Sequence, residues 1–175
     1  MNLETTARGF CRATPENLTI GQKDFTEMLI DQIESEIGRA LPDSYRSFLT
    51  VFDDYCYVSY NEFKDEFPDS TGTPWFFWSE ERLGEISSIH GAAKDRMAWE
   101  VLKSYAEINA SKGEKQKSFL ERTQFLVAMA EDDGDILFMD ASDDFSVSVY
   151  MHDTGELKRL EGSFETWLAS ASVQS

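Results

Sequence analysis

The feature that most restricts the fold of this 175-residue chain is an acidic turn between two apolar segments. Residues 124–129 and 136–139 have the composition of buried strands, and Asp132-Asp133-Gly134-Asp135 joins them. A glycine preceded by aspartate supplies the positive φ angles that tight hairpin turns need. The sequence therefore predicts an antiparallel β-hairpin at this place.

More strands are predicted on either side of this hairpin. Residues 146–150 alternate in the manner of a strand, and residues 157–160 continue it after the turn Asp153-Thr154-Gly155. Four antiparallel strands in succession are thus expected, and the aromatic segment 55–60 is a further strand candidate. Ser163 is suited to cap a short closing helix, whose apolar side comprises Phe164, Trp167 and Leu168.

Helical spacing of apolar residues predicts three further helices. The first runs from Asp24 to Ile37, and the second starts at Pro42, since proline suits a first helical position. The third covers residues 92–112 and ends where Ser111-Lys112-Gly113 breaks the pattern. The fold class expected is α+β, with a mostly antiparallel sheet of four to six strands packed by helices, two N-terminal amphipathic helices and a short C-terminal helix.

Charge restricts the partners of the chain. Its 33 acidic and 16 basic side chains give a net charge of -17, which repels phosphate backbones and anionic lipid headgroups and attracts basic surfaces. We therefore expect no nucleic-acid partner and no membrane partner. Acidity that serves solubility alone is the alternative.

The two cysteines and the N-terminal residues bear on where the protein acts. Cys11 and Cys56 match neither a metal-binding spacing nor a disulfide framework. The first residues contain no apolar run of signal-peptide length, and no later stretch approaches the length of a membrane span. The expected localisation is cytoplasmic.

The acidic turn also raises the alternative of a metal-dependent hydrolase. Glu131, Asp132, Asp133, Asp135 and Asp140 do not have the spacing of an EF-hand, in which ligands alternate around a central glycine. His90 and His152 have no zinc-site spacing, and no nucleophile elbow or phosphate-binding loop occurs in the sequence. We expect no catalytic residue, no metal and no cofactor.

Four consecutive aromatic residues, Trp75-Phe76-Phe77-Trp78, are too many for one face of a strand. One possibility for each ring is burial in the hydrophobic core. The other is exposure beside carboxylates, where such rings would form an interface hot spot that attracts a basic partner. For each carboxylate taken alone, a solvated surface position is the alternative. The predicted partner-binding residues are Trp75, Trp78, Glu80, Glu81, Asp132, Asp133, Asp143 and Asp144.

Several motifs, in their order, resemble the SUKH superfamily, which is named partly for yeast Smi/Knr-type cell-wall regulators and consists mainly of bacterial immunity proteins. Residues 33–38 followed by Leu41-Pro42 and by residues 43–49 are similar to the family's opening signature of a helix, Leu-Pro and Tyr-x-x-Phe-Leu. Residues 125–140 resemble its central hairpin, and residues 149–168 its last strands and closing Ser-Phe helix. The chain departs from the family pattern at Asp53-Asp54-Tyr55 and around residues 92–121.

The resemblance implies a single SUKH-like domain over residues 1–175, with an N-terminal extension at 1–22 and a helical insertion at 90–121. It implies a protein without catalysis that binds and neutralises a cognate bacterial toxin domain, often a nuclease. A regulatory scaffold for an endogenous partner is the alternative. The protein is expected to be a monomer or a weak homodimer that pairs through an exposed sheet edge.

Overall fold

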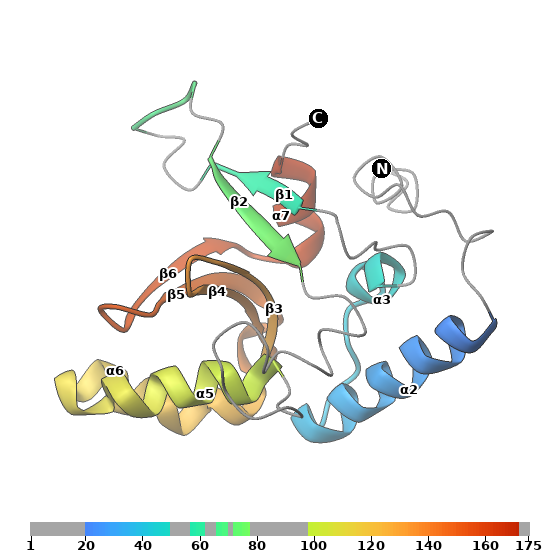
Figure 1. Ribbon diagram of the computed structural model, residues 1–175, viewed down its shortest axis with the longest axis horizontal. Coiled ribbons are helices and arrows are strands. Elements are labelled where there is room, and N and C mark those ends of the chain that lie inside the picture. The colour runs from blue at the N-terminus through green and yellow to red at the C-terminus, as the bar shows by residue number, and fades with distance from the viewer. Residues whose placement is uncertain (1–19, 50–56, 62–65, 70–71, 78–97, 172–175) are drawn as a thin grey trace.

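The computed structural model describes residues 20–49, 57–61, 66–69, 72–77 and 98–171 (Figure 1). Helices surround an antiparallel sheet, which confirms the predicted α+β class. The elements are α2 (Ile20–Ile37), α3 (Asp43–Leu49), β1 (Tyr57–Tyr60), β2 (Thr73–Phe77), α5 (Ala98–Asn109), η3 (Ala110–Lys112), α6 (Glu114–Arg122), η4 (Thr123–Phe125), β3 (Leu126–Asp132), β4 (Asp135–Asp140), η5 (Ala141–Asp143), β5 (Ser146–Met151), β6 (Glu156–Glu161) and α7 (Phe164–Ser170).

The described strands form one sheet in the order β1-β2-β3-β4-β5-β6, and each pairs antiparallel with the next. The four predicted consecutive strands are confirmed as β3 to β6. Asp132 pairs with Asp135, so that only Asp133 and Gly134 form the turn between them. Their φ angles of 47° and 93° are both positive, which is the requirement of a type I′ turn.

The two faces of the sheet are covered by different helices (Figure 1). On one face, Phe119 of α6 packs against Phe138 and Tyr150, with ring centroids 5.7 and 5.1 Å away. On the other face, Phe77 lies 4.8 Å from Phe48 of α3 and 5.6 Å from Trp167 of α7. Both faces are therefore apolar, which explains why β3 and β4 have almost continuous apolar sequences rather than alternating ones.

The sheet is curled so that its two edge strands approach each other near α7. The Tyr60 hydroxyl, on β1, donates a hydrogen bond of 2.9 Å to Glu161, on β6. The Tyr60 ring also stacks on Trp167 at 5.5 Å. The predicted cap of α7 is confirmed, since the Ser163 hydroxyl accepts a hydrogen bond from the Thr166 amide at 3.2 Å.

The helix boundaries differ from the prediction at several points. Helix α2 begins four residues before Asp24, and α3 begins at Asp43 rather than at Pro42. Pro42 instead precedes the helix, where its carbonyl accepts hydrogen bonds from the amides of Tyr45 and Arg46. The predicted third helix is α5, which ends at Asn109, and a further helix, α6, follows Gly113. Residues 90–97 of the helical insertion lie outside the described residues.

Among the described residues, no helix is both long and apolar enough to cross a membrane.

Candidate functional site

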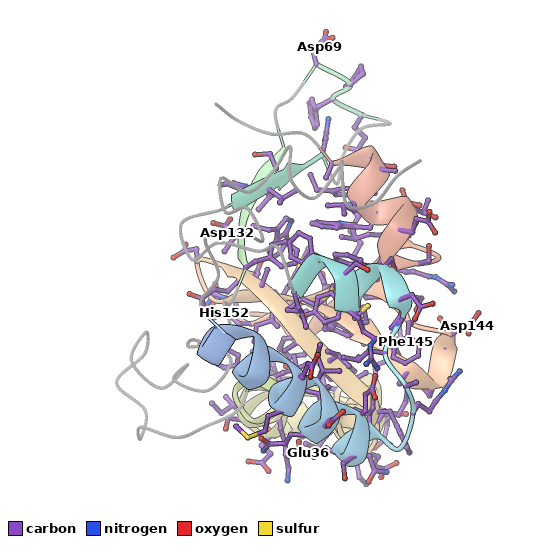
Figure 2. All side chains as sticks on the ribbon, turned by 90° about the vertical axis from the view of Figure 1, so that its right-hand side faces the viewer. Glu36, Asp69, Asp132, Asp144, Phe145 and His152 are labelled. Atoms are coloured by element: carbon purple, nitrogen blue, oxygen red, sulfur yellow. The ribbon has the colours of Figure 1, made fainter. Side chains whose placement is uncertain are left out.

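The four predicted carboxylates of the hairpin region lie at opposite ends of strand β4. Asp132, the last residue of β3, and Asp133 lie at the β3–β4 turn, whereas Asp143 and Asp144 belong to the connection between β4 and β5. A six-residue strand is about 20 Å long. Figure 2 shows Asp132 on one side of the molecule and Asp144 on the other. The structure therefore places these four predicted residues in two separate acidic turns.

Trp75 lies in the core, with 1% of its surface exposed. It alternates with the equally buried Phe77 along β2, so both side chains point to the helix-covered side of this strand. The sequence left two roles open for these aromatic residues, packing in the core and binding a partner. The structure places Trp75 in the core, which does not support a role in partner binding. The other predicted residues of this segment, Trp78, Glu80 and Glu81, lie outside the described residues.

The β3–β4 turn concentrates negative charge. Asp132 and Asp135 face each other directly across the hairpin, and Asp133 between them is exposed. Burial, followed by the charges of Asp133 and Asp135, raises the pKa of Asp132 above its ordinary value. Like charges placed opposite each other are destabilising in a sheet. This turn therefore keeps its carboxylates close together at a cost in stability.

His152 contacts carboxylates on two sides of its ring. Its Nδ1 lies 3.0 Å from an Asp135 carboxylate oxygen, which also accepts a hydrogen bond of 3.0 Å from the His152 amide. On the other side of the ring, Nε2 is 3.1 Å from Asp153. The histidine thus links the β3–β4 turn to the β5–β6 turn, and it leaves Asp132 and Asp133 on the outer side.

Asn109, at the end of α5, holds this region against the helices. Its buried side-chain amide donates hydrogen bonds to the Tyr150 hydroxyl at 2.7 Å and to the His152 carbonyl at 2.9 Å. The Tyr150 hydroxyl in turn donates to the Tyr105 carbonyl at 3.1 Å, and burial raises the pKa of Tyr150. The β5–β6 turn is therefore fixed to α5 by a buried polar network.

The turn between β4 and β5 has an unusual backbone. Asp144 and Phe145 have φ angles of 50° and 58°, although a bulky residue rarely adopts positive φ. Asp140 stabilises the turn, because its carboxylate accepts from the amide and hydroxyl of Ser142, and its carbonyl accepts from the Phe145 amide at 2.8 Å. The turn buries the Phe145 ring and leaves the Asp144 side chain 98% exposed.

Asp143 has closer partners within the protein than its neighbour Asp144. Its carboxylate lies 3.1 Å from a guanidinium nitrogen of Arg159 and accepts a hydrogen bond of 2.7 Å from the Ser146 hydroxyl. Of the two predicted residues in this turn, Asp144 is therefore the more exposed one.

Arg39, in the connection between α2 and α3, lies against this turn. Its guanidinium carbon is 5.1 Å from the centre of the Phe145 ring, its Nη1 donates to the Ala141 carbonyl, and its Nη2 is 3.8 Å from Asp144. A groove of about 400 Å³ opens beside these contacts. We call it the Arg39 groove, and its lining includes Arg39, Asp43, Ser44, Asp144, Phe145 and Glu165.

Most of the Arg39 groove was missed by sequence reasoning, which singled out only Asp144. Arg39 and its acceptor Ala141 are 102 residues apart along the chain, and no local motif predicts that they meet. The capping pattern of Ser163 and the helix start after Pro42 locate two of the contributing segments, but not their proximity. Only the tertiary fold brings the three segments together.

In the part of the chain that the structure describes, no three His, Cys, Asp or Glu side chains are grouped so that they could hold a metal ion.

Comparison with protein families shows to which family this sequence is similar. The model of the SMI1 / KNR4 family (SUKH-1) matches residues 24–170 of this chain, which include every described strand and almost all of the described helices. Neither the curated proteins nor the solved structures compared with the chain match it.

Proposed function

This chain belongs to the SMI1 / KNR4 family (SUKH-1), and we propose that it is a non-catalytic immunity protein that binds and neutralises a basic bacterial toxin domain. The toxin is expected to be of the nuclease type, since a nuclease must present a basic surface to nucleic acid. The protein would cover that surface in the cytoplasm, with its carboxylates in place of the substrate phosphates.

The observation that supports this proposal is the way the fold presents its negative charge. Two separate turns of the sheet project carboxylates into solvent, and Asp133 and Asp144 are exposed at their tips. Both residues adopt positive φ within these turns. Complementary charge of this kind raises the association rate with a basic partner and disfavours acidic ones.

The first experiment is affinity capture from the native bacterium, with the tagged protein as bait at low and high salt, followed by mass spectrometry. A basic toxin fragment recovered stoichiometrically, with less recovery at high salt, is the expected result. The toxin encoded beside the gene is then expressed with and without the protein, and cells are expected to survive only with it. Absence of both complex and protection refutes the proposal.

A matched pair of variants tests whether the acidic turns take part. One variant replaces Asp132, Asp133, Asp143 and Asp144 by Asn, and the control replaces the exposed residues Glu27, Asp31, Glu36 and Asp69 by their amides. Both variants remove four carboxylate charges, so a general charge effect changes both equally. The proposal predicts that the first variant binds the captured toxin more weakly than the control does.

A regulatory scaffold for an endogenous partner is the competing function. It predicts no toxin gene beside this one and a captured partner that is a resident protein of the cell. The capture experiment therefore separates the two functions directly.

A further inference from the structure

We propose that the Arg39 groove receives an arginine or lysine side chain of the partner protein. This inference deepens the proposed function, on which it rests for the basic character of the partner. It names a specific point of contact within the part of the chain described by the structure.

The charge of the groove favours a cation. Asp43, Asp144 and Glu165 each contribute a carboxylate, and Arg39 contributes the opposing positive charge. The three carboxylates come from the start of α3, from the turn after η5 and from the start of α7. Their convergence is therefore a product of the tertiary fold, and two negative charges remain in excess at the groove.

A hydroxyl group lies in the same groove. Ser44 lines the groove, and its hydroxyl oxygen can accept a hydrogen bond. A donor that enters the groove finds an acceptor in this oxygen. A guanidinium or ammonium group supplies such donors, whereas a carboxylate supplies none.

The apolar part of the lining suits the aliphatic part of a basic side chain. Ala40, Pro42 and the Phe145 ring belong to the groove, and arginine and lysine bury their methylene groups along such surfaces. The position of Arg39 over the Phe145 ring shows that this ring accepts a guanidinium. The volume of about 400 Å³ is at the small end of ligand sites, which fits one side chain rather than a helix.

Titration with N-acetyl-arginine amide, followed by backbone amide NMR, tests the groove without a toxin. The neutral isostere N-acetyl-citrulline amide is the control ligand. Arginine is expected to shift the signals around Asp43, Phe145 and Glu165, and citrulline is not. Shifts of equal size with both ligands, or shifts confined to other parts of the protein, overturn the inference.

Two variants of equal charge change test the location. Asp43→Asn with Glu165→Gln removes two carboxylates of the groove, and Asp132→Asn with Asp133→Asn removes two at the far end of β4. The groove variant is expected to weaken arginine binding about fivefold, the loss of two partly exposed charge contacts. The control variant is expected to leave it unchanged, and equal weakening by both variants overturns the inference. Amide spectra of the free variants confirm that both are folded.

The same variants separate this inference from the proposed function. If the protein captures and neutralises a toxin but the groove variant binds that toxin as well as the wild type does, the groove is refuted and the function stands. If arginine binds in the groove while no toxin is captured or neutralised, the groove stands and the function fails.

Discussion

Replacement of Gly134 by alanine tests the mechanical link between the β3–β4 turn and His152. Gly134 has a φ of 93°, and a Cβ atom at this position would lie 3.0 Å from both Cε1 and Nδ1 of the His152 ring. Real Cβ atoms rarely approach other atoms so closely, so the imidazole would have to move away from Asp135. The substitution thus combines backbone strain with the loss of a polar contact.

The magnitude follows from these two contributions. An L-residue at positive φ costs about 1–2 kcal/mol, partly offset by about 0.4–1 kcal/mol because alanine restricts the unfolded chain. Displacement of His152 from the partly exposed Asp135 adds about 0.5–1 kcal/mol. We expect Gly134→Ala to lower the free energy of unfolding by about 2 kcal/mol.

Gly38→Ala is the matched control, because Gly38 has a φ of 69° but no atom lies within 4 Å of the place that an alanine methyl group would take. It carries the backbone strain alone and is expected to cost about 1 kcal/mol. Urea denaturation at neutral pH, monitored by tryptophan fluorescence, measures both. Equal losses for the two variants would refute the contact with His152. A second check is His152→Ala, which should reduce the cost of Gly134→Ala to that of the control.

Three further predictions concern stability. Ser163→Ala removes the hydrogen bond to the Thr166 amide and should cost about 1 kcal/mol in thermal or urea unfolding, whereas Ser163→Asp should cost little; equal costs contradict the capping role. Arg122→Gln leaves the buried Asp140 carboxylate without its ion pair and should lower the free energy of unfolding by about 2 kcal/mol. The loss should be smaller when Asp140→Asn is added. No loss would mean that the hydrogen bonds from Ser142 are enough to satisfy the Asp140 carboxylate. The raised pKa of Asp132 means that the folded state holds this proton more tightly than the unfolded state does, so wild-type stability should fall as pH rises from about 3.8 through the raised pKa. Asp132→Asn should abolish this fall in stability with pH, and at neutral pH the variant should be more stable than the wild type by about 0.5 kcal/mol or less. A pH dependence of stability parallel to that of the wild type would contradict this prediction.

The sheet could be predicted from sequence because its information is local. The Asp133-Gly134 turn fixes the register of β3 and β4 by itself, since positive φ at both positions is the signature of a two-residue hairpin. The cap at Ser163 is likewise a property of neighbouring residues. Such features need no knowledge of the rest of the fold.

The helices were harder to delimit for the opposite reason. Helix α6, with the sequence EKQKSFLER, buries only Phe119, so its apolar periodicity is weak although it packs on the sheet. Helix α2 begins before Asp24, because a helix may extend beyond the residues that face the core. Pro42 precedes α3 and supplies its carbonyl, a role that the sequence does not distinguish from a first helical position.

The candidate site depended most on tertiary structure. Sequence reasoning placed Asp132, Asp133, Asp143 and Asp144 in one predicted partner-binding set on the ground of their charge. A strand holds its two ends apart, whereas the fold brings Arg39 and Asp144 together from distant parts of the chain. The local sequence also could not predict that Trp75 is buried. Four successive aromatic residues show no alternation of apolar and polar residues that would identify the core face.

The separation of the two acidic turns has a consequence for how a partner binds. They are about one β4 length apart, or about 20 Å, whereas charges are screened over about 8 Å at physiological salt. Each turn therefore acts at close range on a different part of the partner, and both contribute to long-range attraction only at low salt. A partner that uses the Arg39 groove as its anchor should lose affinity with Glu165→Gln at any salt concentration. The same partner should lose association rate with Asp133→Asn mainly at low salt, and measurement of both rate constants across a salt series distinguishes these two effects.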